Sequence, residues 1–188
     1  MGAGAMNTLQ NLLMLLAAFL AVFGEAAFPG TSHWLKAQID LLPALMVYAS
    51  LSAGPAMIAG LAVCGGLLFD SLSANPFGIS IFPLLAVGFA IYARRDLILR
   101  DQPFAQWVLG FAASAAAPVL SVLLLLTAGQ TPLLGWGSLW QWLVMSLGGA
   151  VAAPIFFYVF DWGQRTLGYR RVTETSFRPD REIRRGRS

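Results

Sequence analysis

Long apolar runs follow one another along this chain, separated by short polar stretches. Hydrophobic residues make up 57% of the 188 residues and charged residues 11%, and the run from Leu12 to Phe23 holds no charge at all. A soluble domain typically carries about a quarter charged residues, and its apolar residues repeat on one face. Helices satisfy their own backbone hydrogen bonds in lipid. We therefore predict an all-α, polytopic integral membrane protein with one transmembrane domain over residues 1–162.

The apolar runs predict a six-helix bundle. Gly54-Pro55 is expected to separate the second helix from the third, because proline breaks a helix interior. One helix from Leu41 to Leu72 would also measure about 48 Å, against a hydrocarbon core of about 30 Å. A re-entrant pair of short helices is the alternative for residues 39–70. The six predicted spans cover residues 8–28, 39–53, 55–70, 77–93, 106–128 and 139–160.

The first apolar run has two interpretations, a retained helix or a secretory signal peptide. The run is short and Gly-Glu-Ala-Ala follows it, as in some signal peptides. A signal peptide begins with basic residues, however, and no Lys or Arg precedes Lys36. The first run is therefore predicted to remain as a membrane helix.

Basic residues gather in one loop and in the C-terminal tail, so they indicate topology. By the positive-inside rule, this side faces the cytoplasm, and both termini are predicted to lie there. The tail over residues 163–188 is rich in arginine and is predicted to be disordered. Because these charges lie beside apolar spans, nucleic acid is not expected as a partner. Five arginines are predicted either to attract anionic lipid or to dock a cytoplasmic partner, and both alternatives stay open. These are Arg94, Arg95, Arg165, Arg170 and Arg171.

The residues that carry chemistry in enzymes are sparse. Cys64 is the one cysteine and His33 the one histidine, so neither a disulfide within the chain nor a histidine or cysteine metal site is expected. No nucleophile–base pair and no phosphate-binding loop is recognisable. The sequence therefore predicts a protein that is not an enzyme and that holds no cofactor and no metal.

The stretch from Gly65 to Ser80 holds the sharpest candidate site residue, Asp70. A carboxylate at membrane depth costs about 2.5 to 3.5 kcal/mol at the centre of a span, so it invites a functional interpretation. One interpretation is a cap on the turn that follows, made with Ser71, Ser73 and Asn75. The other is a contact to a partner protein or ligand. The motif residues of this stretch are Gly66, Asp70, Ser71, Pro76, Phe77 and Gly78. Three further acidic residues, Glu25, Asp40 and Asp161, are predicted to lie at the membrane interface.

Small residues recur four positions apart in the third span, at Ala56, Gly60 and Cys64. This spacing allows two helices to approach closely. The row is predicted to be a helix-packing face, either inside the bundle or against a partner membrane protein. Pro118 and Pro154 fall inside the fifth and sixth spans and predict kinks there.

The segment from Asp40 to Arg95 resembles the rod shape-determining protein MreD family. The resemblance rests on the short span that closes on Ala-Gly-Pro, on the motif from Gly66 to Gly78, and on the next helix with Gly88. It implies a non-enzymatic inner-membrane scaffold of the bacterial elongasome, which takes part in regulating cell shape and lateral peptidoglycan synthesis. The implied partners are MreC directly, and MreB and the wall-synthesis glycosyltransferase and transpeptidase through the complex.

The same family is similar in fold to the substrate-binding subunits of energy-coupling-factor transporters. That similarity implies an alternative function, a membrane subunit that binds a small molecule such as a vitamin. In this alternative, Asp70 and the turn to Gly78 would close over a ligand pocket near the outer face. A vitamin pocket usually needs several convergent polar groups, which these spans hold sparsely.

Overall fold

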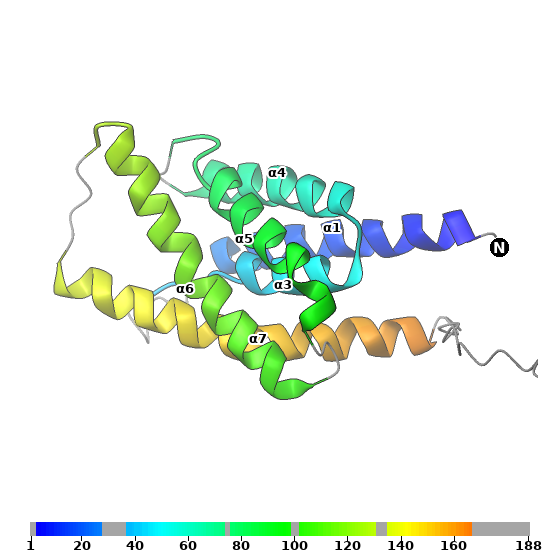
Figure 1. Cartoon of the computed structure of the whole chain (residues 1–188). Helices are drawn as coiled ribbons and strands as arrows, with labels where there is room; N and C mark the ends of the chain where they lie inside the picture. Colours follow the sequence, from blue (N-terminus) through cyan, green and yellow to red (C-terminus); the bar gives the residue numbers. More distant parts are fainter. Residues whose placement is uncertain (1–2, 28–36, 74–75, 99–101, 131–134, 167–188) are drawn as a thin grey trace, which may run out of the picture.

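The computed structural model describes residues 3–27, 37–73, 76–98, 102–130 and 135–166, and within these ranges it contains helices and no strand (Figure 1). This confirms the predicted all-α class. The α-helices are α1 (Ala3–Ala27), α3 (Leu42–Ser52), α4 (Pro55–Leu72), α5 (Ile81–Ala93), α6 (Pro103–Thr127) and α7 (Trp136–Thr166), and a 3-10 turn, η1 (Arg95–Leu97), follows α5. Of the tail predicted to be disordered, residues 163–166 are helical as the end of α7, and residues 167–188 lie outside the described residues.

Four of the helices, α1, α4, α6 and α7, are long and apolar enough to cross a membrane. The other two are shorter than predicted. α3 has 11 residues and α5 has 13, which gives about 16 and 20 Å at 1.5 Å per residue. The expectation that 39–53 and 77–93 are helical throughout is therefore wrong at their first residues. Residues 37–41 before α3 and residues 76–80 before α5 are not helical, so both helices begin later than predicted.

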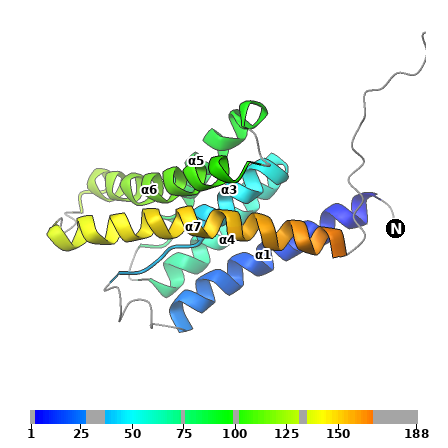
Figure 2. The ribbon, with the colours of Figure 1, turned by 90° about the horizontal axis from the view of Figure 1, so that it is seen from below.

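The short helix α3 is the centre of the bundle. It contacts each of the other five α-helices, and every residue from Leu42 to Ser50 is buried. Figure 1 shows α3 between α4 above it and α7 below it, and Figure 2 shows the same bundle from below. Its sequence, LPALMVYASLS, is apolar on all faces, and a helix of that kind is stable when it is surrounded. A sequence run that resembled a membrane span is thus the core of the protein.

Tyr48 connects α3 to α7. It is fully buried, and its ring stacks on Phe160 at 4.6 Å between centroids and meets the edge of Phe157 at 5.0 Å. Its hydroxyl oxygen accepts a hydrogen bond of 3.0 Å from Gln164. A buried tyrosine needs a partner for its hydroxyl group, so Gln164 completes this contact at the C-terminal end of α7.

Helices α6 and α7 pack closely where their residues are small. A Cβ atom on Gly110 would collide with Ala153, and one on Gly149 would collide with Ser114. Small residues let helix backbones approach in this way. Both helices continue through their internal prolines, Pro118 and Pro154.

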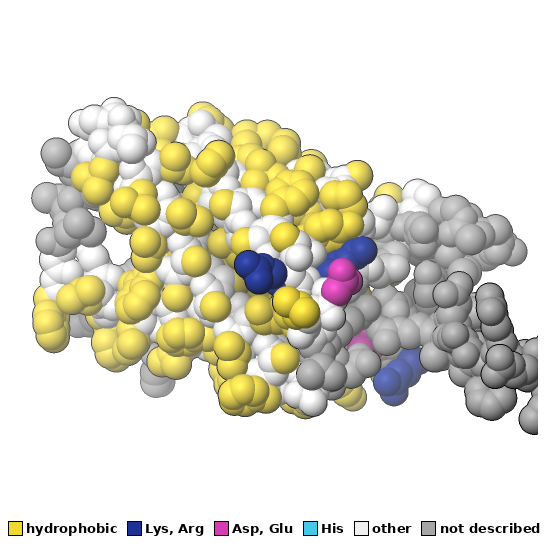
Figure 3. Space-filling model, viewed as in Figure 1, with side chains coloured by type: hydrophobic (Ala, Val, Ile, Leu, Met, Phe, Trp, Pro, Cys, Tyr) yellow, Lys and Arg dark blue, Asp and Glu magenta, His cyan; other side chains and the backbone are white. Residues whose placement is uncertain are grey.

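The outer surface is mainly apolar, as a lipid-facing surface requires. Figure 3 shows hydrophobic side chains over most of the visible face, while the few charged groups lie in the half nearer the N-terminus. Figure 1 places the N-terminus and the end of α7 on the same side of the bundle. The turn between α4 and α5 lies at the opposite end.

Candidate functional site

The extended segment of residues 37–41, which leads into α3, has its backbone satisfied by side chains. The Gln141 side chain of α7 pairs with both backbone groups of Gln38: its Oε1 accepts from the Gln38 N–H at 3.1 Å, and its Nε2 donates to the Gln38 carbonyl at 2.9 Å. Glu25 Oε1 accepts from the Leu41 N–H at 2.7 Å. Asp40 Oδ1 accepts from the Leu42 N–H at 2.9 Å. Backbone groups that belong to no helix or strand need such partners, and side chains supply them here.

The segment packs against α7, with Ala37 buried, Gln38 exposed and residues 39–41 half-buried. A Cβ atom on Gly148 of α7 would collide with the Ile39 side chain. Asp40 and Met145 line one cavity, and Met145 is nine residues from the start of α7, about 14 Å along the helix axis. The absence of a side chain at Gly148 thus lets the segment pass close to α7.

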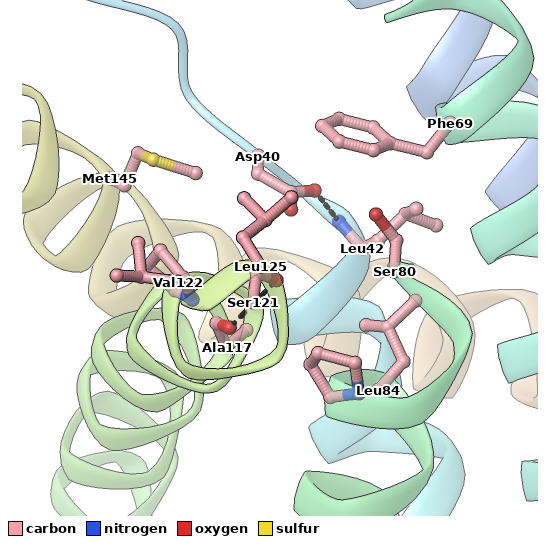
Figure 4. Close-up of a pocket in the computed structure, with 12 residues that line it drawn as sticks. Asp40, Leu42, Phe69, Ser80, Leu84, Ala117, Ser121, Val122, Leu125 and Met145 are labelled. Atoms are coloured by element: carbon pink, nitrogen blue, oxygen red, sulfur yellow. Dashed lines mark hydrogen bonds between the residues drawn. The ribbon is translucent and has the colours of Figure 1, made fainter. Parts of the chain in front are cut away.

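A cavity of about 230 Å³ adjoins Asp40, between the start of α3, the end of α4, the start of α5 and the second half of α6 (Figure 4). Most of its walls are apolar side chains such as Phe69, Leu84 and Leu125. The full set of lining residues is Asp40, Leu42, Phe69, Ser80, Pro83, Leu84, Ala117, Pro118, Ser121, Val122, Leu125 and Met145.

Asp40 is the carboxylate of this cavity. Figure 4 shows one of its oxygens bonded to the Leu42 N–H, and no described residue donates a hydrogen bond to the other. The two hydroxyl groups in the walls are already donors, Ser80 to Asp70 Oδ1 at 2.6 Å and Ser121 to the Ala117 carbonyl at 3.1 Å. Asp40 lies outside the helices, and its burial raises the pKa of its carboxyl group. The site therefore presents one acceptor with spare capacity in apolar surroundings.

The sequence interpretation of Glu25 and Asp40 as interfacial residues stays a prediction, and the structure shows both side chains half-buried. Both carboxylates lie against the first residues of α3, and they hold consecutive N–H groups, those of Leu41 and Leu42. The pattern could not reveal this, because an acid at the end of an apolar run is typical of an interface. Gln141 gave no signal either, since one glutamine near a span end is common. Asp161 is half-buried near the end of α7.

Asp70 holds the turn between α4 and α5. It is 1% exposed, and it accepts from the Gly78 N–H at 2.7 Å, the Ser80 N–H at 3.3 Å and the Ser80 hydroxyl group at 2.6 Å. The turn-cap interpretation therefore describes its contacts, but the predicted partners were wrong: the Ser71 hydroxyl donates to the Leu68 carbonyl, and Ser73 Oγ has no hydrogen bond. Asn75 lies outside the described residues.

The other motif residues divide into buried and exposed groups. Gly66 faces the backbone of Ile81, and a Cβ atom added to Gly66 would lie 3.0 Å from the Ile81 nitrogen. The absence of a side chain at Gly66 therefore allows α4 to approach α5 closely. Gly78 has φ of +89°, a conformation that glycine adopts at little cost. Ser71, Pro76 and Phe77 are exposed, and Phe77 is 77% exposed. They remain available for a contact outside the bundle.

The row Ala56, Gly60 and Cys64 does not pack inside the bundle. Ala56 and Cys64 are exposed, and a Cβ atom on Gly60 would meet nothing within 4 Å. The neighbouring pair Ala62 and Gly66 is buried instead. The internal-packing interpretation of this row is therefore wrong, and the partner-face interpretation stays a prediction.

The described arginines lie far from the cavity along their helices. Arg94 and Arg95 follow the end of α5, whereas the cavity adjoins its start, and both are exposed. Arg95 pairs with Asp96 at 3.7 Å and lies over the Tyr92 ring at 4.3 Å. Arg165 is exposed near the end of α7. Arg170 and Arg171 lie outside the described residues.

In the part of the chain that the structure describes, no three His, Cys, Asp or Glu side chains form a group that could hold a metal ion. Comparison of the chain with protein-family models, with curated proteins and with solved structures finds no match. The fold and the site define a helical membrane protein with two half-buried, backbone-paired carboxylates and an adjoining cavity.

Proposed function

We propose that this chain is a non-enzymatic scaffold of the bacterial elongasome, which binds MreC in the inner membrane and helps regulate cell shape and lateral peptidoglycan synthesis. MreB and the wall-synthesis glycosyltransferase and transpeptidase are reached through that complex. The resemblance of residues 40–95 to the MreD family is the source of the proposal. Both termini are proposed to be cytoplasmic, in line with the positions of the arginines.

The observation that carries this proposal is the uncovered row of small residues on α4. Ala56, Gly60 and Cys64 lie on the outside of the bundle, four positions apart. In lipid, such a row favours close packing against another membrane helix. MreC is expected to have one membrane-spanning helix, since the resemblance implies a bitopic partner, and one helix is what this row can accommodate.

The test is a cross-link from α4 to MreC in native membranes. Cys64 is the one cysteine in the chain and is exposed, so a thiol-reactive photocross-linker can be placed there without other changes. MreC in the cross-linked product supports the proposal. Gly60→Leu is expected to reduce the yield, and Val63→Cys in a Cys64→Ala background serves as a neighbouring attachment point. Cross-linking to lipid alone at both positions would refute this interface.

The alternative function is a small-molecule binding subunit of an energy-coupling-factor transporter. The cavity beside Asp40 favours it, because it lies near the α4–α5 turn, where such a pocket was expected. Affinity purification in mild detergent, followed by mass spectrometry of proteins and small molecules, separates the two functions. Recovery of MreC and wall-synthesis enzymes supports the scaffold. Recovery of ATP-binding-cassette ATPases or a vitamin supports the transporter subunit.

A further inference from the structure

The cavity beside Asp40 has the size of a small-molecule site. Its volume is about 230 Å³, which exceeds the roughly 150 Å³ of an engineered apolar cavity that binds benzene. It is smaller than the pockets of about 300 to 1,000 Å³ that take drug-sized ligands. A molecule with one aromatic ring or a short aliphatic chain therefore fits its volume.

The electrostatics of the cavity select a positive charge. Asp40 has one oxygen to which no described residue donates a hydrogen bond. A second carboxylate, Glu25, is close by, because it accepts from the N–H group of the next residue, Leu41. The described basic side chains, Arg94, Arg95 and Arg165, lie near the other ends of α5 and α7. A half-buried carboxylate that no described cation balances is costly in apolar surroundings, and a cation with hydrogen-bond donors would remove that cost.

We propose that this cavity binds a small organic amine, whose ammonium group donates to Asp40 while its apolar body packs between α5 and α6. Pro83 and Leu84 of α5 and Val122 and Leu125 of α6 form the apolar walls. The hydroxyl oxygens of Ser80 and Ser121 can accept the remaining ammonium protons. This site is separate from the α4 row proposed to bind MreC, so either can fail without the other.

The test measures thermal stabilisation of the full chain in phosphatidylcholine nanodiscs, using tryptophan fluorescence. Phenethylamine is the cationic probe, and phenethyl alcohol is its neutral counterpart of nearly equal size. The amine is expected to bind at least about tenfold more tightly, because a charge-assisted hydrogen bond is stronger than a neutral one. Equal binding of the two probes to the wild-type chain would overturn the proposal without any variant.

Two variants locate the site. Asp40→Asn keeps an oxygen for the Leu42 N–H, so the fold is expected to survive, and the amine is expected to lose its advantage over the alcohol. Ser121→Leu fills the cavity and is expected to abolish binding of both probes. Asp96→Asn removes an exposed carboxylate beyond α5 and is expected to change nothing. An Asp40→Asn chain that still prefers the amine would place the binding elsewhere.

A free amine and the ammonium headgroup of phosphatidylethanolamine share this chemistry. Repeating the titration in nanodiscs that contain phosphatidylethanolamine distinguishes them. Unchanged affinity for phenethylamine assigns the site to a free amine. Competition by the lipid, absent in the Asp40→Asn chain, assigns the natural ammonium group to the headgroup. Competition that persists in that variant would show that the lipid acts at another site, and it would contradict the headgroup assignment.

Discussion

The side chain of Gln141 pairs with both backbone groups of Gln38, a residue 103 positions earlier in the chain. This pair fixes the extended segment 37–41 against α7. It explains how this non-helical backbone is satisfied, since a side chain of α7 supplies two of the hydrogen bonds that a helix would have made internally. The pair also positions Asp40 two residues later, beside the cavity.

Gln141→Leu is expected to destabilise the protein, because it leaves the Gln38 N–H and carbonyl unpaired. Each of these exposed hydrogen bonds contributes about 0.5 to 1.5 kcal/mol. The measurement is the melting temperature in detergent by tryptophan fluorescence. Val151→Ala, an exposed substitution on the same helix, is the control and is expected to change Tm little. An unchanged Tm in Gln141→Leu would show that the segment does not depend on this pair.

Gly149→Ala is expected to lower Tm, because the new methyl group collides with Ser114 at the closest approach of α6 and α7. Overpacking of this kind costs about 1 to 3 kcal/mol. Gly163→Ala is the matched control on α7, since its Cβ atom would meet nothing within 4 Å. The control is expected to raise Tm slightly, because alanine favours a helix over glycine by up to about 1 kcal/mol. If both variants behaved alike, the close contact of α6 and α7 would be wrong.

Asp70→Ala is expected to destabilise the turn between α4 and α5, since it removes the acceptor for Gly78 and for both groups of Ser80. Losing such a buried, charged acceptor costs more than about 1.5 kcal/mol. Limited proteolysis at the turn measures the effect, and faster cleavage is expected. Ser71→Ala, which removes one exposed hydroxyl group, is expected to be neutral. Equal cleavage of both variants would contradict the structural role of Asp70.

Asp40→Asn is expected to raise Tm at about pH 7, and the gain is expected to vanish toward pH 4. Burial raises the pKa of Asp40 in the folded protein, so the folded state binds a proton more readily than the unfolded state. The residue therefore lowers stability increasingly as pH rises above the ordinary Asp value of about 4. Melting curves at several pH values measure this. A Tm difference that is independent of pH would contradict the buried position of the carboxyl group.

Local rules of the sequence determined the class of the protein and most of its helices. The low charge and long apolar runs predict a helical membrane protein, because helices satisfy their backbone within lipid. Gly54-Pro55 predicts the break between α3 and α4, because proline cannot continue the helix interior. Asp70 was singled out because a carboxylate in an apolar run is costly, and a cap on the following turn was one of its two interpretations.

The tertiary structure alone decided which residues lie inside. Whether Asp40 lines a cavity depends on how α5 and α6 pack beside it, and its own neighbours in sequence do not contain that information. The same holds for Ala56, Gly60 and Cys64, whose spacing permits close packing but does not say which helix provides it. The apolar character of a helix does not distinguish a buried helix from a lipid-facing one well, because lipid and the protein interior are both apolar. The sequence therefore determined that these residues form helices, and packing decided that α3 would be the core and Asp40 would line a cavity.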